Sequence, residues 1–211
     1  MDITQTITLA LIQGFTEFLP VSSSAHLVIL PKFLDWPDQG LAFDVVLHFA
    51  TLCAIIFYYR SSLVSLTKDF YDSIATRKTQ GESMLAWGII LGTIPVGIVG
   101  LLFRESIELN LRSYQVVAFA TIFFGLLLGF SDWLHRKFQK SRDYIRGSDI
   151  LIVGCFQALA LIPGTSRSGI TISAALLIGL SRNLSIKYAF LLSIPVIALA
   201  TLLKTFDLVK D

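Results

Sequence analysis

The stretch QGFTEFLPVSSSAH, residues 13–26, places a carboxylate, a proline, three serines and a histidine inside an otherwise apolar N-terminal segment. A second apolar segment is interrupted in a similar way by PGTSRSG, residues 163–169. Each half of these two broken segments is about ten to sixteen residues long, which is short for a membrane span and suits a re-entrant hairpin. The sequence therefore predicts two re-entrant helical hairpins, over residues 3–30 and 150–180.

The composition around these hairpins is that of an integral membrane protein. Of 211 residues, 54% are hydrophobic and only 15% are charged, whereas soluble domains carry about 25% charged residues. The opening residues MDITQTITLA lack the basic start of a signal peptide, so we expect them in the mature protein. Four further segments are long and apolar enough to predict about four full spans in an all-α fold: 41–59, 84–103, 114–134 and 188–203.

Basic residues indicate how these segments are oriented. They gather after the first predicted span (Arg60, Lys68, Arg77 and Lys78) and after the third (Arg136, Lys137, Lys140, Arg142 and Arg146), while only Arg104 and Arg112 separate the second and third spans. Basic loops stay in the cytoplasm. The two hairpins then enter from opposite sides of the membrane, and their tips meet near its middle.

The two broken segments also resemble each other, since both run from a glutamine through apolar residues to a proline and a serine-rich turn. Broken helices at matching positions of two repeats indicate a binding site near the midplane of the membrane. We therefore expect one membrane domain, residues 1–211, that is an inverted-repeat bundle with repeat one at about 1–134 and a partial repeat two at about 148–211.

Arg167 is the most informative single position, because an arginine in hydrocarbon is costly and needs a partner or water. One interpretation is a structural ion pair with Glu17 or Asp44. The other is an anion clamp, since the guanidinium fork matches phosphate oxygens. Ser166 and Ser168 would add hydroxyl donors, and Gly164 would let the backbone amides approach the anion.

Glu17 and Gln13 lie four residues apart, so on a helix they share one face. Their oxygens could hold a divalent cation such as Mg²⁺ or Ca²⁺. Glu17 could instead act as a general base, or be a buried carboxylate that is protonated or paired with Arg167. His26 could carry a proton to or from a nucleophile. Asp44 and His48 share one face of a span and are expected to orient the site through hydrogen bonds.

Together these residues favour attack on a phosphoryl group, with Arg167 and a cation stabilising the negative charge. The apolar surroundings suggest a phosphate that carries a lipid tail. The alternative function is a transporter or flippase of a phosphorylated lipid or another anion, because inverted repeats with paired broken helices are also a transporter layout. Nothing in the sequence indicates nucleic-acid binding.

QGFTEFLPVSSSAHL followed by ALIPGTSRSG resembles the undecaprenyl-diphosphatase family, also called bacitracin-resistance proteins, and the resemblance covers residues 1 to about 204. It implies a multi-pass enzyme of the bacterial inner membrane, with a periplasm-facing site, that hydrolyses undecaprenyl diphosphate to undecaprenyl phosphate and inorganic phosphate. This reaction recycles the lipid carrier of peptidoglycan synthesis. Family members usually have six spans in two inverted repeats, about two more than the four expected in this chain. The resemblance leaves open whether the protein forms a homodimer.

The resemblance also implies roles for individual residues. It makes Glu17, Ser23, His26 and Arg167 catalytic, with Ser23 the favoured nucleophile. It assigns the metal to Glu17 and Gln13, although many members have glutamate where this chain has Gln13. The expected substrate-binding residues are Gln13, Ser22, Ser24, Gly164, Thr165, Ser166 and Ser168.

Overall fold

The computed structural model describes residues 2–37, 39–103, 106–107, 110–111, 113–138 and 141–210. Arg104, Arg112 and Lys140, three of the basic residues used for orientation, lie outside these ranges. The described part of the chain is helical and has no strand: α1 (Ile3–Thr16), α2 (Ser23–Phe33), α3 (Gly40–Tyr58), α4 (Arg60–Thr76), α5 (Ser83–Leu102), α7 (Tyr114–Phe138), α8 (Gly147–Ala158), η1 (Leu159–Leu161), α9 (Arg167–Leu177) and α10 (Arg182–Lys210).

Three of these helices, α5, α7 and α10, are long and apolar enough to cross a membrane. They confirm the spans predicted at 84–103, 114–134 and 188–203. The span predicted at 41–59 appears as α3, which meets the same criterion only together with α4, and the two helices are bent by 74° at the break between them. The all-α membrane fold is therefore as predicted, with three or four candidate spans.

The segment after α3 was predicted as a basic loop, and this prediction is wrong, because residues 60–76 form the helix α4. The segment is amphipathic rather than apolar, so it does not stand out as a span. Leu63, Leu66 and Phe70 fall at helical spacing and pack into the core beside α5. Arg77, in the left-handed conformation with φ 54°, ends the helix.

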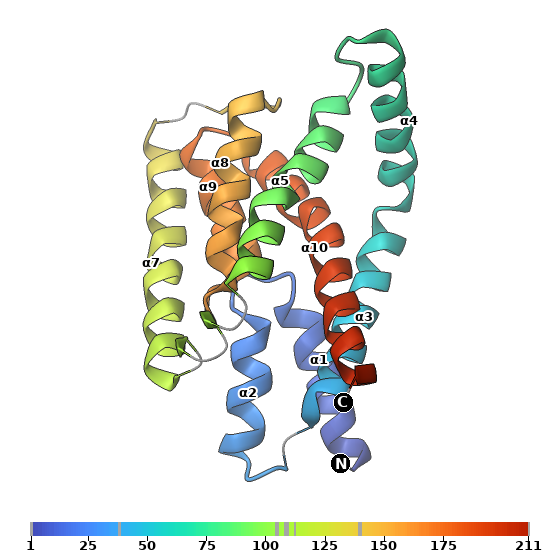
Figure 1. The fold of residues 1–211 in the computed structure, drawn as a ribbon. Helices are drawn as coiled ribbons and strands as arrows, with labels where there is room; N and C mark the ends of the chain where they lie inside the picture. The colour runs from blue at the N-terminus through green and yellow to red at the C-terminus, as the bar shows by residue number, and fades with distance from the viewer. Residues whose placement is uncertain are drawn as a thin grey trace.

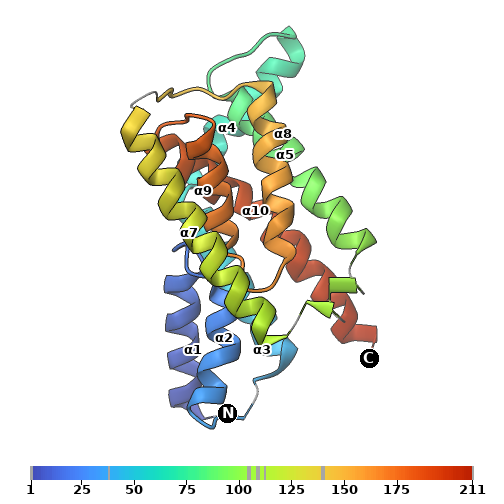
Figure 2. The ribbon, with the colours of Figure 1, turned by 90° about the vertical axis from the view of Figure 1, so that its left-hand side faces the viewer.

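The two predicted hairpins are confirmed as α1–α2 and α8–α9. In α1 the side chain of Asp2 caps the first turn together with Gln5, and α2 resumes after the turn that contains Pro20. In the second hairpin Pro163 and Gly164 lie in the turn, and the hydroxyl of Ser166 accepts a hydrogen bond from the Gly169 amide to cap α9. The hairpins enter the bundle from opposite ends, and their tips meet in its middle (Figures 1 and 2).

The second hairpin is held by the main hydrophobic core, which α4, α5, α8, α9 and α10 share. Gly154 of α8 packs directly on α5, so that a Cβ at this position would lie 2.9 Å from the Gly92 carbonyl oxygen. Tyr188 of α10 is fully buried, and its hydroxyl donates to the Gly88 carbonyl at 3.1 Å. These contacts fix α8 and α10 against α5, and α9, which begins at Arg167, packs on both α8 and α10.

Candidate functional site

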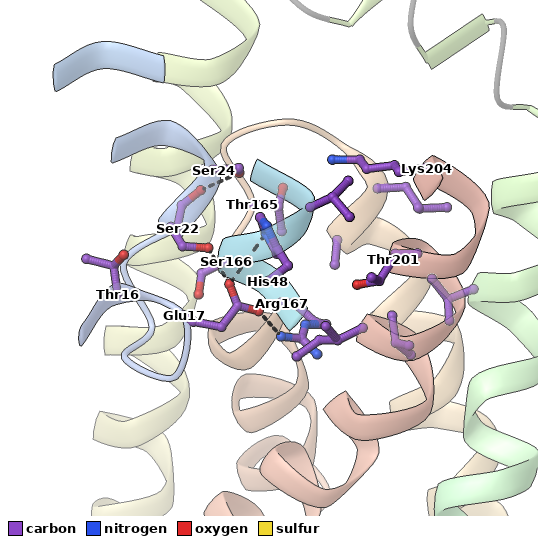
Figure 3. Close-up of a pocket in the computed structure, with 18 residues that line it drawn as sticks. Thr16, Glu17, Ser22, Ser24, His48, Thr165, Ser166, Arg167, Thr201 and Lys204 are labelled. Atoms are coloured by element: carbon purple, nitrogen blue, oxygen red, sulfur yellow. Dashed lines mark hydrogen bonds and ion pairs between the residues drawn. The ribbon is translucent and has the colours of Figure 1, made fainter. Parts of the chain in front are cut away.

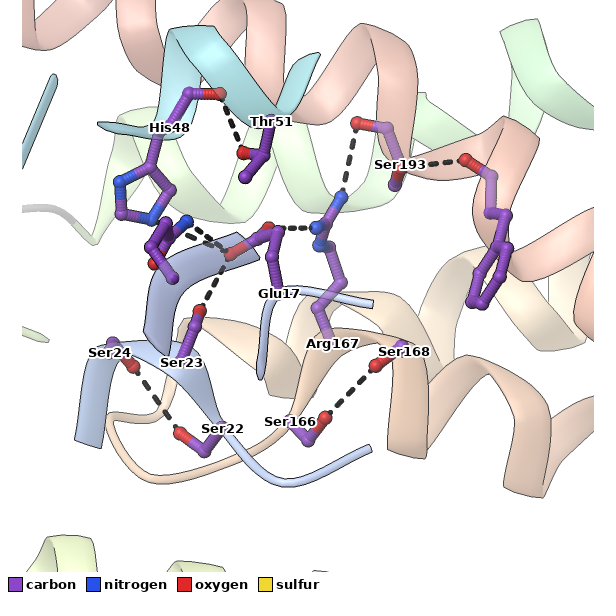
Figure 4. A network of polar contacts seen from close by, with 12 residues as sticks. Glu17, Ser22, Ser23, Ser24, His48, Thr51, Ser166, Arg167, Ser168 and Ser193 are labelled. Atoms are coloured by element: carbon purple, nitrogen blue, oxygen red, sulfur yellow. Dashed lines mark hydrogen bonds and ion pairs between the residues drawn. The ribbon is translucent and has the colours of Figure 1, made fainter. Parts of the chain in front are cut away.

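An ion pair between Arg167 and Glu17 joins the two hairpin tips (Figure 4). Both side chains are mostly shielded, with 15% of the arginine and 6% of the glutamate exposed. A second guanidinium nitrogen of Arg167 donates to the Ser193 carbonyl of α10 at 3.1 Å. The pairing matches the structural reading of Arg167, and the position of the pair at a cavity keeps the anion-clamp reading open.

The carboxylate of Glu17 is the centre of a polar cluster (Figure 4). Its Oε2 accepts hydrogen bonds from Ser23 Oγ at 2.6 Å and from Gln13 Nε2 at 2.9 Å. The Nε2 atom of His48 lies 3.8 Å from the same oxygen. A hydroxyl that donates to a carboxylate is positioned to lose its proton to that carboxylate, so Ser23 and Glu17 have the geometry of a nucleophile and its base.

The backbone of Ser22 adopts the left-handed conformation, with φ 59° and ψ 88°. This is unusual for a residue that is not glycine, and such outliers gather at functional sites. The ring Nδ1 of His26 lies 2.8 Å from the Ser22 carbonyl, and the hydroxyls of Ser22 and Ser24 are 3.4 Å apart. These contacts hold the turn that presents Ser23.

The two histidines near the tip differ in where they lie. His26 is exposed and does not line the cavity, whereas His48 lines it and reaches the Glu17 carboxylate. The ring of His48 is held by a contact of 2.7 Å between its Nδ1 and the Asp44 carbonyl. The carboxylate of Asp44 points elsewhere and accepts a hydrogen bond from Gln39 at 3.0 Å.

A cavity of about 180 Å³ opens beside the tips (Figure 3). Eight of the residues predicted for the site line it: Glu17, Ser22, Ser23, Ser24, His48, Thr165, Ser166 and Arg167. The remaining wall is largely apolar and includes Val96, Leu161 and, on α10, Val196, Ile197 and Ala200. A polar end beside an apolar wall suits a charged group with a hydrocarbon tail.

Ser168 and Gly164, which were also predicted for the site, do not line this cavity. The hydroxyl of Ser168 donates to the Leu19 carbonyl at 3.2 Å and lies 3.1 Å from the Ser166 hydroxyl, so it ties the two tips together. Gly164, with φ 92°, packs so closely on α7 that a Cβ there would collide with the Val117 backbone. Its carbonyl accepts a hydrogen bond from Thr121 at 3.1 Å.

Gln13 and Glu17 are the residues predicted to hold a divalent cation. Among the described residues, no group of three or more histidine, cysteine, aspartate or glutamate side chains could hold a metal ion. Gln13 is fully buried, however, and its Oε1 has no hydrogen-bond partner there. An oxygen left unpaired next to a carboxylate is a donor set of the kind that a hard cation takes, with phosphate and water completing its shell.

Three polar residues of the cavity were not predicted from the sequence: Thr16 of α1, and Thr201 and Lys204 of α10. A lysine near the end of an apolar helix is usually read as a membrane-edge residue. Only the spacing of three residues between Thr201 and Lys204, which places them on one helix face, could have indicated a shared site.

Comparisons with known proteins indicate the family of this chain. The family model "Bacitracin resistance protein BacA" matches residues 6–211. The chain is 58% identical over 208 residues to an undecaprenyl-diphosphatase of Ruthia magnifica subsp. Calyptogena magnifica, which covers 99% of this chain and 78% of that protein. It is 55% identical to undecaprenyl-diphosphatase 2 of Stutzerimonas stutzeri, over 100% and 78% of the two chains. The chain therefore belongs to the bacitracin resistance protein BacA family.

Proposed function

We propose that this protein hydrolyses undecaprenyl diphosphate to undecaprenyl phosphate and inorganic phosphate in the bacterial membrane, and so recycles the lipid carrier for cell-wall synthesis. The observation that carries the proposal is the meeting of Glu17, Ser23 and Arg167 at one cavity, although they come from opposite hairpins. The names of relatives that cover nearly all of the chain support it.

In the proposed reaction, Ser23 Oγ attacks the terminal phosphorus while its proton passes to Glu17, which already accepts its hydrogen bond. The new bond joins Oγ to phosphorus, and the bond from phosphorus to the bridging oxygen breaks, releasing undecaprenyl phosphate. Water then hydrolyses the phosphoserine and releases inorganic phosphate. Direct attack by water at the place of Ser23 Oγ is the alternative route.

Arg167 stabilises the charge that moves onto the phosphate oxygens during this step. The Ser193 carbonyl and Glu17 hold its guanidinium in place, so the group needs little reorganisation when substrate arrives. Ser166, whose hydroxyl also lines the cavity, supplies a further donor from the turn before α9.

The proton that the leaving group or the water exchanges has two candidate carriers. His48 is the imidazole that the cavity contains, and its Nε2 lies 3.8 Å from Glu17 Oε2. A catalytic role for His26 stays a prediction, and its contact with the Ser22 carbonyl supports a role in positioning the Ser23 turn.

A divalent cation, Mg²⁺ or Ca²⁺, would be held by Glu17 and by the unpaired Oε1 of Gln13. When bound, it would neutralise part of the diphosphate charge. Gln13 itself cannot act as a base, so the acid–base work falls to Glu17 in either case.

We also propose that the cavity opens toward the periplasm. The first hairpin enters from that side if the basic residues Arg60, Lys68, Arg77 and Lys78, near α4 and its end, are cytoplasmic. A substrate whose diphosphate lies at the outer surface would then reach the tips without carrying its charge across the bilayer.

The test is phosphate release from undecaprenyl diphosphate by the purified protein, with and without a chelator. We expect release that falls when divalent cations are removed, and loss of release in Ser23→Ala. The control Ser61→Ala, at an exposed position of α4 outside the cavity, should retain release. Transport of a prenyl phosphate without any phosphate release would support the transporter alternative. Substantial release by Ser23→Ala would favour attack by water.

A further inference from the structure

The charge balance of the cavity leaves room for another cationic group. Arg167 is already neutralised by Glu17, so this pair has a net charge near zero. A lipid diphosphate carries two or more negative charges near neutral pH, of which the proposed divalent cation would neutralise only part. It would enter a site with apolar walls, where unbalanced charge is costly. Lys204 of α10 is the other lysine or arginine among the described residues that line the cavity.

Lys204 is partly buried, and its side chain lies along the cavity across from the Glu17 cluster (Figure 3). No hydrogen bond or ion pair of its ammonium group is found among the described residues, whereas Lys187 on the same helix is paired with Glu82 at 2.6 Å. A partly buried cation that lines a cavity and has no partner among the described residues is a candidate for ligand binding.

Two buried hydroxyls accompany this lysine. The Oγ1 atoms of Thr165 and Thr201 are both shielded from solvent, and neither has a hydrogen-bond partner in the described part of the chain. Both residues line the same cavity as Lys204. Buried hydroxyls are nearly always paired, so two unpaired ones beside one cavity indicate that a ligand supplies the missing acceptors.

We propose that Lys204, Thr201 and Thr165 form a second phosphate subsite on the α10 side of the cavity. This inference rests on the proposed function: the terminal phosphate would bind at Arg167, and the lipid-linked phosphate at Lys204. The ammonium group would stabilise the negative charge that the leaving phosphate gains when the bridging bond breaks. The apolar α10 residues beside it, Val196 and Ile197, would contact the start of the prenyl chain.

The first experiment compares Lys204→Gln with Lys210→Gln. Lys210 is on the same helix, outside the cavity, with its ammonium over the Phe206 ring. We expect Lys204→Gln to lower kcat/KM for undecaprenyl diphosphate by roughly 10- to 100-fold, the range for a hydrogen bond to a charged group. Lys210→Gln should leave it unchanged, and Lys204→Arg should restore most of the activity.

The second experiment measures the binding of inorganic pyrophosphate and orthophosphate to the same proteins by calorimetry. A subsite for the second phosphate predicts that Lys204→Gln weakens pyrophosphate binding by a similar factor and changes orthophosphate binding little. Thr201→Val should weaken pyrophosphate binding less, while Thr205→Val, whose hydroxyl donates to the Thr201 carbonyl on the exposed side of α10, should have no effect.

Unchanged kcat/KM and unchanged pyrophosphate binding in a folded Lys204→Gln protein would overturn the subsite, and phosphate release by the wild type would leave the proposed function standing. Conversely, wild-type protein that binds pyrophosphate through Lys204 but releases no phosphate would overturn the function and retain the subsite. A melting temperature for each variant separates these results from a failure to fold.

Discussion

The two hairpins meet at their tips but are packed very differently. In the second, eight of the eleven residues of α9 are buried, whereas in the first only Leu9 and Gln13 of the fourteen residues of α1 are. Large apolar side chains of α1 are open instead, such as Phe15 with 68% of its surface exposed. Arg167 is thus on the tightly packed hairpin, while Glu17 and Ser23 are on the loosely packed one.

This difference gives the ion pair between Glu17 and Arg167 a mechanical role beside its chemical one. It is a direct link from the firmly held hairpin to the carboxylate that serves Ser23. The hydrogen bond from Ser168 to the Leu19 carbonyl is a second link, made without charge. The positions of Glu17 and Ser23 on the loosely packed tip therefore depend on contacts with the tightly packed hairpin.

The largest expected effect comes from breaking the charged link. Arg167→Ala should lower phosphate release by roughly 1000-fold, because a preorganised donor to the reacting phosphate is lost and Glu17 is left buried without its partner. Phosphate release from undecaprenyl diphosphate is the measurement. Arg182→Ala, which removes an exposed pair with Asp132 at 2.6 Å, is the matched control and should stay near wild type.

Arg167→Lys sharpens the result, since lysine keeps the charge but cannot engage Glu17 and a phosphate with one planar fork. It should regain little of the lost activity. Near-normal release by either Arg167 variant would remove the arginine from the proposed mechanism.

An intermediate effect on activity is expected from replacing either of the two histidines near the first hairpin tip, His26 of α2 and His48 of α3. His48→Gln should lower kcat roughly 10- to 100-fold and flatten the pH dependence, as loss of a proton carrier does. His26→Gln should lower activity through the Ser22 turn and leave the shape of the pH profile intact. The measurement is kcat against pH for both variants, and the opposite pattern would assign the proton to His26.

The smallest effect on phosphate release is expected from replacing one glycine in each hairpin by alanine, which tests how tightly each hairpin is packed. Gly154→Ala should destabilise the protein by about 1–3 kcal/mol, because its methyl group would collide with the Gly92 backbone. Gly14→Ala in α1 has open space around the new methyl group and should stabilise the protein by up to about 1 kcal/mol. Thermal unfolding in detergent measures both, and equal destabilisation would contradict the packing difference.

Much of the fold could be predicted from the sequence, because prolines and hydroxyl side chains inside apolar segments have few structural explanations. The two hairpins, the apolar spans and a partnership of Glu17 with Arg167 all followed from this. The helix α4 did not, since an amphipathic segment of low hydropathy resembles a loop when only apolar runs are counted.

The site was harder to predict in its details, because sequence proximity was taken for spatial proximity. His26 stands beside the serines in the chain, but its ring turns back to the Ser22 carbonyl. His48, from another helix, is the imidazole that reaches Glu17. Thr201 and Lys204 line the cavity because their face of α10 is turned toward the hairpin tips. Helical periodicity shows that the two residues share a face, but it does not show what that face packs against.

The close seat of Gly164 on α7 has a practical consequence. Only 11% of the apolar part of α7 is buried in the described structure, yet this helix contacts the turn that contains Gly164 through Thr121 and the Val117 backbone. We expect an amphiphile that displaces α7 to move this turn as well. Phosphate release should then vary with bilayer thickness and with the detergent, so that rates measured in different micelles are not directly comparable.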